Sequence, residues 1–137
     1  MQVSGATLRS SVMGTYTRID VKRFDRPVYE HFNQAFNKKE YLFYWEYVPA
    51  GTSGWGIGLD YYTLDRMTIR SLPSDASDAL DAHLVQAGDW YAYVYSSWQA
   101  NPAITVVCTS TGMHFAAAGK LVVRKCACVL AVQPLRP

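Results

Sequence analysis

Short segments with a period-two alternation of side-chain character recur along most of the chain. They are rich in β-branched and aromatic residues, which strands favour. They begin at Val3 (VSGAT), Gly14 (GTYTRID), Arg26 (RPVYEHF), Glu40 (EYLFYWEY), Ser53 (SGWGIGL), Arg66 (RMTIR), Trp90 (WYAYVYS) and Ala103 (AITVVCT). Stretches that contain Gly, Pro or Asn separate them, as turns require. The pattern predicts an all-β fold, a compact antiparallel β-sandwich or β-barrel of about eight or nine short strands.

One segment has a different period. Residues 74–88, SDASDALDAHLVQAG, combine a capping serine, acidic residues in a first turn, Leu80 and Leu84 on one face, and Gly88 as a stop. These features predict one short helix, although a loop rich in Asp and Ser could imitate them.

The character of the chain changes after Thr109. The segment STGMHFAAAG is typical of a loop, and KLVVRKCACVLAV is apolar on both faces except at Arg124 and Lys125. This favours a last strand covered on both sides, which the prolines of QPLRP end. We therefore expect a single β domain over residues 1–137, with a module core at 3–108 and a C-terminal extension at 109–137.

Composition narrows the class of protein. Of the 137 residues, 50% are hydrophobic and 18% are charged, which indicates a folded domain. A net charge of only +2 argues against nucleic acid as a partner, because phosphate binding needs many clustered cations. No apolar run is long enough for a membrane span.

The cysteines are too few for a disulfide framework. Cys108, Cys126 and Cys128 cannot all pair with one another, so we expect reduced thiols. Together with an N-terminal segment that lacks the apolar core of a signal peptide, this favours an intracellular protein, unless a presequence has been removed. Cys126 and Cys128 alone give too few ligands for a metal, and we expect neither a metal nor a cofactor.

The order of several motifs resembles a family of small aromatic-rich β modules. The segments GTYT, RPVY, YLFYW, GWGIG and NPAITV follow one another within residues 3–108. The resemblance implies a β fold and no established activity, since the family is uncharacterised. Residues 109–137 have no counterpart in that pattern.

The aromatic strands supply the candidate binding residues. EYLFYWEY and WYAYVYS carry rings on both faces, and clustered rings that stay exposed mark binding sites. The alternative is that the rings only fill half-buried positions of a sheet. In GWGIG, the bare backbone of alternate glycines would receive either a neighbouring ring or a flat ligand. The candidates are Tyr44, Trp45, Trp55, Asp60, Tyr91, Tyr93, Tyr95 and Trp98.

No common catalytic motif such as G-x-S-x-G is present. We therefore expect no enzyme but a non-catalytic binding or assembly module, a small subunit of or docking element for a larger protein complex. In the extension, the partner-facing candidates are Arg124, Lys125, Cys126 and Cys128.

Two alternatives remain open at this point. One is a carbohydrate-binding module, with a glycan stacked on the tyrosines or on Trp45, Trp55, Trp90 or Trp98. The other is an enzyme with a centre formed by Cys108 and either His31 or His114.

Overall fold

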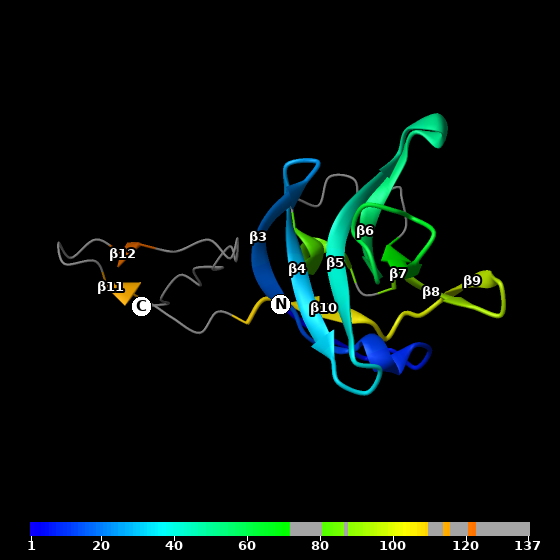
Figure 1. The fold of residues 1–137 in the computed structure, drawn as a ribbon, viewed down its shortest axis with the longest axis horizontal. Coiled ribbons are helices and arrows are strands. Elements are labelled where there is room, and N and C mark those ends of the chain that lie inside the picture. Colours follow the sequence, from blue (N-terminus) through cyan, green and yellow to red (C-terminus); the bar gives the residue numbers. More distant parts are fainter. Residues whose placement is uncertain (72–80, 87, 110–113, 116–120, 123–137) are drawn as a thin grey trace, which may run out of the picture. The chain divides into compact units, whose positions relative to one another are not determined.

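The computed structural model describes residues 1–71, 81–86, 88–109, 114–115 and 121–122. The chain divides into two compact units, Met1–Val107 and Cys108–Pro137. Strands dominate the described residues of the first unit, so the all-β prediction is confirmed (Figure 1). In the part of the chain that is described, no helix has the length and apolar character needed to cross a membrane.

A seven-stranded antiparallel sheet forms most of the first unit. Its strands follow one another in space in chain order, so neighbours in the sheet are also neighbours along the chain. They are β3 (Thr17–Arg23), β4 (Arg26–Asn33), β5 (Lys38–Tyr47), β6 (Thr52–Gly58), β7 (Met67–Ser71), β8 (Trp90–Val94) and β9 (Ser97–Ala100).

A three-stranded antiparallel sheet completes the first unit, with the order β10-β1-β2. It brings the two ends of the unit together, because Val3 faces Val106 across β1 and β10. Its strands are β1 (Gln2–Ser4), β2 (Gly14–Thr15) and β10 (Thr105–Val107). Among the described residues, three 3-10 helices lie between strands: η1 (Ser10–Val12), η2 (Val48–Ala50) and η3 (Ala82–Leu84). In the second unit, β11 (His114–Phe115) pairs with β12 (Leu121–Val122).

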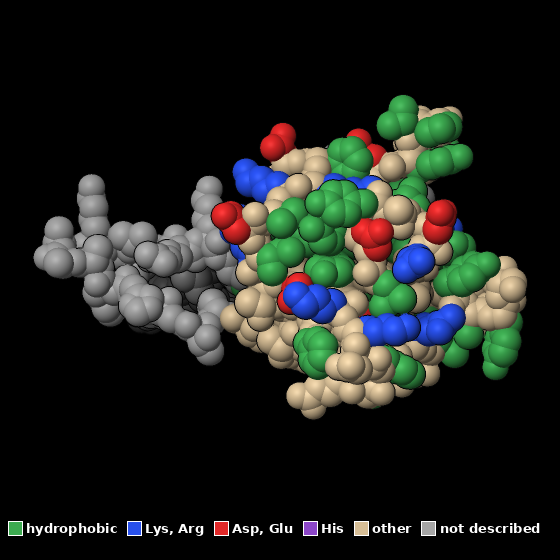
Figure 2. Space-filling view, viewed as in Figure 1, with side chains coloured by type: hydrophobic (Ala, Val, Ile, Leu, Met, Phe, Trp, Pro, Cys, Tyr) green, Lys and Arg blue, Asp and Glu red, His purple; other side chains and the backbone are tan. Residues whose placement is uncertain are grey.

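Both faces of β5 are buried. Leu42 and Tyr44 belong to one face, Phe43 and Trp45 to the other, and all four side chains are almost fully removed from water. On the second face, Phe43 and Trp45 form a core cluster with Val28 and Met67. Partly buried side chains pack around this cluster: Ile19, Val21, Tyr41, Tyr61, Leu64 and Trp98. Figure 2 shows hydrophobic side chains gathered over β4 and β5.

The glycines of β6 are covered by neighbouring side chains. A Cβ atom at Gly54 or Gly56 would contact the Trp45 ring, and at Gly56 it would also collide with the Met67 sulfur. The register explains this, because Trp45 is paired with Gly54 and Phe43 with Gly56. The bare backbone of GWGIG therefore receives a ring of the adjacent strand.

Three details differ from the sequence-based expectations. The segment from Trp90 to Ser96 is not one strand, because β8 ends at Val94 and the chain turns at Tyr95 and Ser96 to form β9. The helix expected over residues 74–88 falls largely outside the described residues, and its described part holds only the 3-10 helix η3. Cys108 is in a disulfide bond whose partner lies outside the described residues, so the prediction of a reduced thiol was wrong there.

Candidate functional site

Three of the candidate residues are buried in the sheet. Tyr44, Trp45 and Trp55 are at most 4% exposed, so they serve the core and offer no surface to a partner. Tyr44 packs edge-on against Trp55 at 5.7 Å between ring centroids, and its hydroxyl donates to the Ser53 hydroxyl. The expectation that these rings form a binding surface was wrong, because the cluster around Phe43 covers one face of β5 and the interior of the unit covers the other.

Four other candidates come together on the β8–β9 hairpin, which projects from the edge of the seven-stranded sheet (Figure 1). Tyr93 is paired with Trp98 in register, and their ring centroids are 5.2 Å apart. Tyr91 lies on the same face because the side chains of a strand alternate. From the neighbouring strand β7, Arg70 is paired with Tyr91, and its guanidinium lies 4.3 Å from the Trp98 ring centroid. The hairpin thus carries a stacked group of arginine and aromatic side chains.

The turn of this hairpin has an unusual sequence for its shape. Tyr95 and Ser96 both have positive φ angles, 49° and 63°. A two-residue hairpin turn with two positive φ angles is a type I′ turn, which favours Asn-Gly. Here its first position holds a tyrosine whose side chain is 90% exposed. The turn therefore presents a ring to solvent from a strained backbone.

The charge around the hairpin is positive. Arg9 donates from Nε to the Tyr93 carbonyl at 2.9 Å, which places a second guanidinium at β8 in addition to Arg70 of β7. Partial burial lowers the pKa of Arg70, although an arginine keeps its charge at any physiological pH. Residues 90–100 contain no Asp or Glu. The hairpin is thus suited to an acidic partner.

The outer edge of β9 has backbone groups directed away from β8. The Asn101 N–H donates to the Trp90 carbonyl at 2.8 Å, so these two residues form a hydrogen-bonded pair. In an antiparallel ladder such pairs alternate with non-bonded pairs, which places the N–H and C=O groups of Trp98 and Ala100 on the outer edge. Within the described ranges, β9 pairs with β8 alone.

Asp60, another candidate, has a structural role in the loop between β6 and β7. Its carboxylate accepts a hydrogen bond from the Tyr62 N–H at 2.8 Å and lies 3.5 Å from the Thr63 hydroxyl. The loop carries Tyr61 and Tyr62, whose ring centroids are 4.4 Å apart, and Tyr61 packs against Tyr41 at 4.8 Å. Hydrogen bonding to Tyr62 and burial raise the pKa of Tyr61 to about 12. The sequence analysis did not predict this ring group, because the segment YYT follows a strand and is typical of a loop.

The structure places some residues of the two alternative functions in the interior. His31 lies with Nδ1 3.1 Å from the Thr15 carbonyl and with its ring 5.1 Å from the Tyr16 ring, while the disulfide of Cys108 leaves it no thiolate. Trp45, Trp55 and Trp90 are buried, so stacking on a sugar would depend on Trp98, beneath Arg70, and on the tyrosines.

The remaining candidates cannot be placed. Arg124, Lys125, Cys126 and Cys128 lie outside the described residues. Among the residues that are described, no three His, Cys, Asp or Glu side chains gather as metal ligands would.

Comparisons with known proteins leave the chain without an assigned family. No family model matches it, and neither a curated protein nor a solved structure gives a significant match. The resemblance of residues 3–108 to small aromatic-rich β modules stays a prediction.

Proposed function

We propose that the chain is a non-catalytic protein-binding module that docks an extended, acidic segment of its partner along β9. Tyr93, Tyr95 and Trp98 act as the anchoring rings, and Arg70 and Arg9 supply the charge. This role fits a small subunit of, or a docking element for, a larger complex. The observation that supports it most strongly is the turn at Tyr95, where strain and exposure coincide.

Within the described part of the chain, packing of the Tyr95 ring offsets little of the strain in its backbone. A left-handed conformation costs a residue other than glycine about 1 kcal/mol, and Tyr95 and Ser96 both adopt it. A ring that is 90% exposed recovers little of this by packing. In a complex, burial of about 180 Å² of a tyrosine side chain would contribute about 4.5 kcal/mol at 25 cal/mol per Å². A bound partner would therefore offset the strain that an aromatic residue costs at this position.

The composition of the hairpin also supports a protein partner. Tyrosine, tryptophan and arginine are the residue types enriched at the energetic centres of protein interfaces. An extended segment can add to a sheet edge through main-chain hydrogen bonds, while pockets or rings on the face select its side chains. The outward N–H and C=O groups of Trp98 and Ala100 provide the first part of this scheme, and the ring group of Tyr93 and Trp98 provides the second.

A peptide selection tests the proposal. A displayed library of random peptides is selected on the intact chain, and the affinity of the selected peptides is measured for three variants, Tyr95→Ala, Trp98→Ala and Tyr62→Ala. Tyr62 is the matched control, because it is a highly exposed tyrosine of another loop. We expect acidic peptides that lose affinity at least about tenfold with the first two variants, as hot-spot residues do, and keep it with the third. Selected peptides that bind all three variants equally would refute the proposal, as would a selection that yields no binder.

A further inference from the structure

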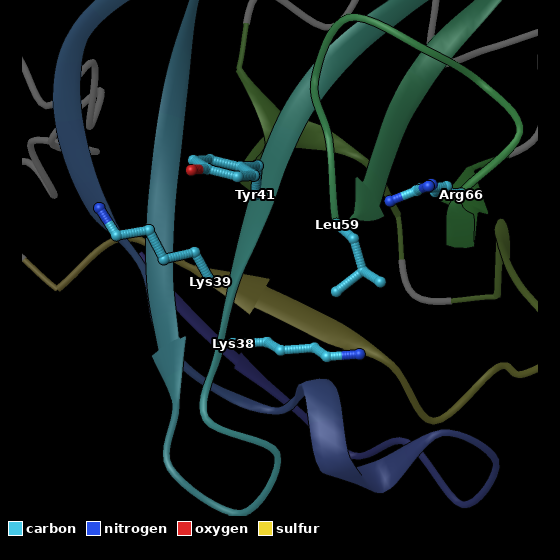
Figure 3. A pocket seen from close by; sticks show the side chains of 5 residues that line it. All are labelled: Lys38, Lys39, Tyr41, Leu59 and Arg66. Carbon is cyan, nitrogen blue, oxygen red and sulfur yellow. The ribbon is translucent and has the colours of Figure 1, made fainter.

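A hollow of about 270 Å³ opens between three segments of the seven-stranded sheet. It lies at the start of β5, at the residue after β6 and at the residue before β7 (Figure 3). Three of its five lining residues are cationic, and the other two offer a ring and an aliphatic side chain: Lys38, Lys39, Arg66, Tyr41 and Leu59. None of them belongs to the β8–β9 hairpin.

The fold holds Arg66 against the end of β6. The register of β6 and β7 shifts between Ile57 and Gly58, and the Leu59 N–H donates to the Arg66 carbonyl at 3.4 Å. A Cβ atom at Gly58 would lie only 2.8 Å from that carbonyl oxygen, so the close approach needs a glycine. The backbone of Arg66 is therefore held beside the end of β6, at one side of the hollow.

The charges around the hollow are unequally compensated. Lys39 pairs with Glu30 at 3.0 Å, and this contact raises the pKa of the lysine. Neither Lys38 nor Arg66 has an ion pair within the described part of the chain. In Figure 3 the Lys39 amino group points away across β4, whereas the Lys38 amino group and the Arg66 guanidinium lie on either side of Leu59. Two positive charges thus remain beside an apolar surface.

We propose that this hollow binds the phosphate group of a small molecule, with Lys38 and Arg66 as the phosphate ligands. Arginine and lysine are the usual partners of phosphate oxygens in proteins. The volume lies below the roughly 300–1,000 Å³ of drug-sized sites, so it suits a small ligand. Leu59, between the two cations, provides an apolar contact for the part of the ligand that carries the phosphate. Free phosphate and a small phosphorylated molecule share this chemistry.

The test is a titration with inorganic phosphate at constant ionic strength, followed by amide chemical shifts in nuclear magnetic resonance spectra. We expect saturable shifts around Lys38 and Arg66. Lys38→Gln and Arg66→Gln should each weaken binding about fivefold or more, the effect of losing about 1 kcal/mol. Glu30→Gln should tighten binding, because it removes the carboxylate that neutralises Lys39. A parallel titration with phenyl phosphate identifies the source: tighter binding than inorganic phosphate indicates a phosphorylated molecule, and equal binding indicates free phosphate.

Lys22→Gln is the matched control for charge. Lys22 is paired with Pro27 in β3–β4, and Lys38 with Asn33, so the two lysines are about 20 Å apart along β4 at 3.3 Å per residue. The control should leave phosphate binding unchanged. Shifts that never saturate, or equal losses with Lys22→Gln and Lys38→Gln, would overturn the proposal. Trp98→Ala should not affect phosphate binding, so failure of this site and failure of the hairpin site are distinguishable.

Discussion

Replacing Tyr95 and Ser96 by asparagine and glycine should stabilise the protein and remove its binding function. The Tyr95→Asn, Ser96→Gly variant places Asn-Gly at a two-residue turn with φ angles of 49° and 63°. Asn-Gly is the preferred sequence of that turn. Stability and function are then expected to change in opposite directions, which a purely structural role of Tyr95 would not produce.

The expected gain in the free energy of unfolding follows from three contributions. Relief of two left-handed conformations contributes about 2 kcal/mol. The greater freedom of glycine in the unfolded chain costs up to about 1 kcal/mol. The lost packing of the ring is small, since Tyr95 is 90% exposed, and costs about 0.5 kcal/mol for 20 Å². The sum is a gain of about 0.5–1.5 kcal/mol in the free energy of unfolding, or a few degrees in melting temperature.

Urea unfolding followed by tryptophan fluorescence measures the stability, and calorimetry with a selected peptide measures the binding. The matched control for the binding is Phe24→Asn, Asp25→Gly, because these residues form the two-residue turn between β3 and β4 with φ angles of 50° and 59°. The control should keep the binding, and its gain in stability should be smaller, because Phe24 is only 45% exposed and its ring lies 5.3 Å from the Arg23 guanidinium. A Tyr95 variant that is less stable than the parent would refute the reasoning about strain, and one that binds the peptide with full affinity would refute the role of the ring.

Three further predictions concern the interior and the hollow. Burial raises the pKa of Glu40 above its usual 4.5, so the free energy of unfolding should fall as pH rises from about 4.5 through the raised value. Urea unfolding between pH 4 and 8 measures this fall, and Glu40→Gln should abolish it. Tyr29→Phe removes a buried 2.7 Å hydrogen bond to Asp81 and should lower the unfolding free energy by about 1–3 kcal/mol; an unchanged denaturation midpoint would contradict this. Gly58→Ala should lower stability by about 2 kcal/mol and weaken phosphate binding, whereas intact phosphate affinity would show that Arg66 is held by other contacts.

Period-two alternation was enough to predict most strands of the first unit. The segments from Arg26, Glu40 and Ser53 became β4, β5 and β6. The same rule failed at Tyr95, because an aromatic residue in a type I′ turn reads as the continuation of a strand. The sequence carries no Asn or Gly there that would have indicated the hairpin.

Alternation could not decide which rings are buried. Trp45 and Trp55 lie on opposite faces of the sheet, yet both are inaccessible. The cover on the Trp45 face comes from side chains elsewhere in the sequence, among them Ile19, Val21 and Leu64. The cationic hollow was missed for a similar reason, since the register shift at Gly58 brings Arg66 toward Lys38 from the far end of a loop.

Hydrogen exchange of the hairpin amides tests the central claim most directly. In the free chain, the amides of Trp98 and Ala100 face outward from β9 and should exchange fast, while the Asn101 amide, bonded to the Trp90 carbonyl, should exchange slowly. Addition of a selected peptide should slow exchange at Trp98 and Ala100, because a strand paired with β9 would bond to them. Unchanged exchange at both amides in a saturated complex would contradict the proposed docking along β9.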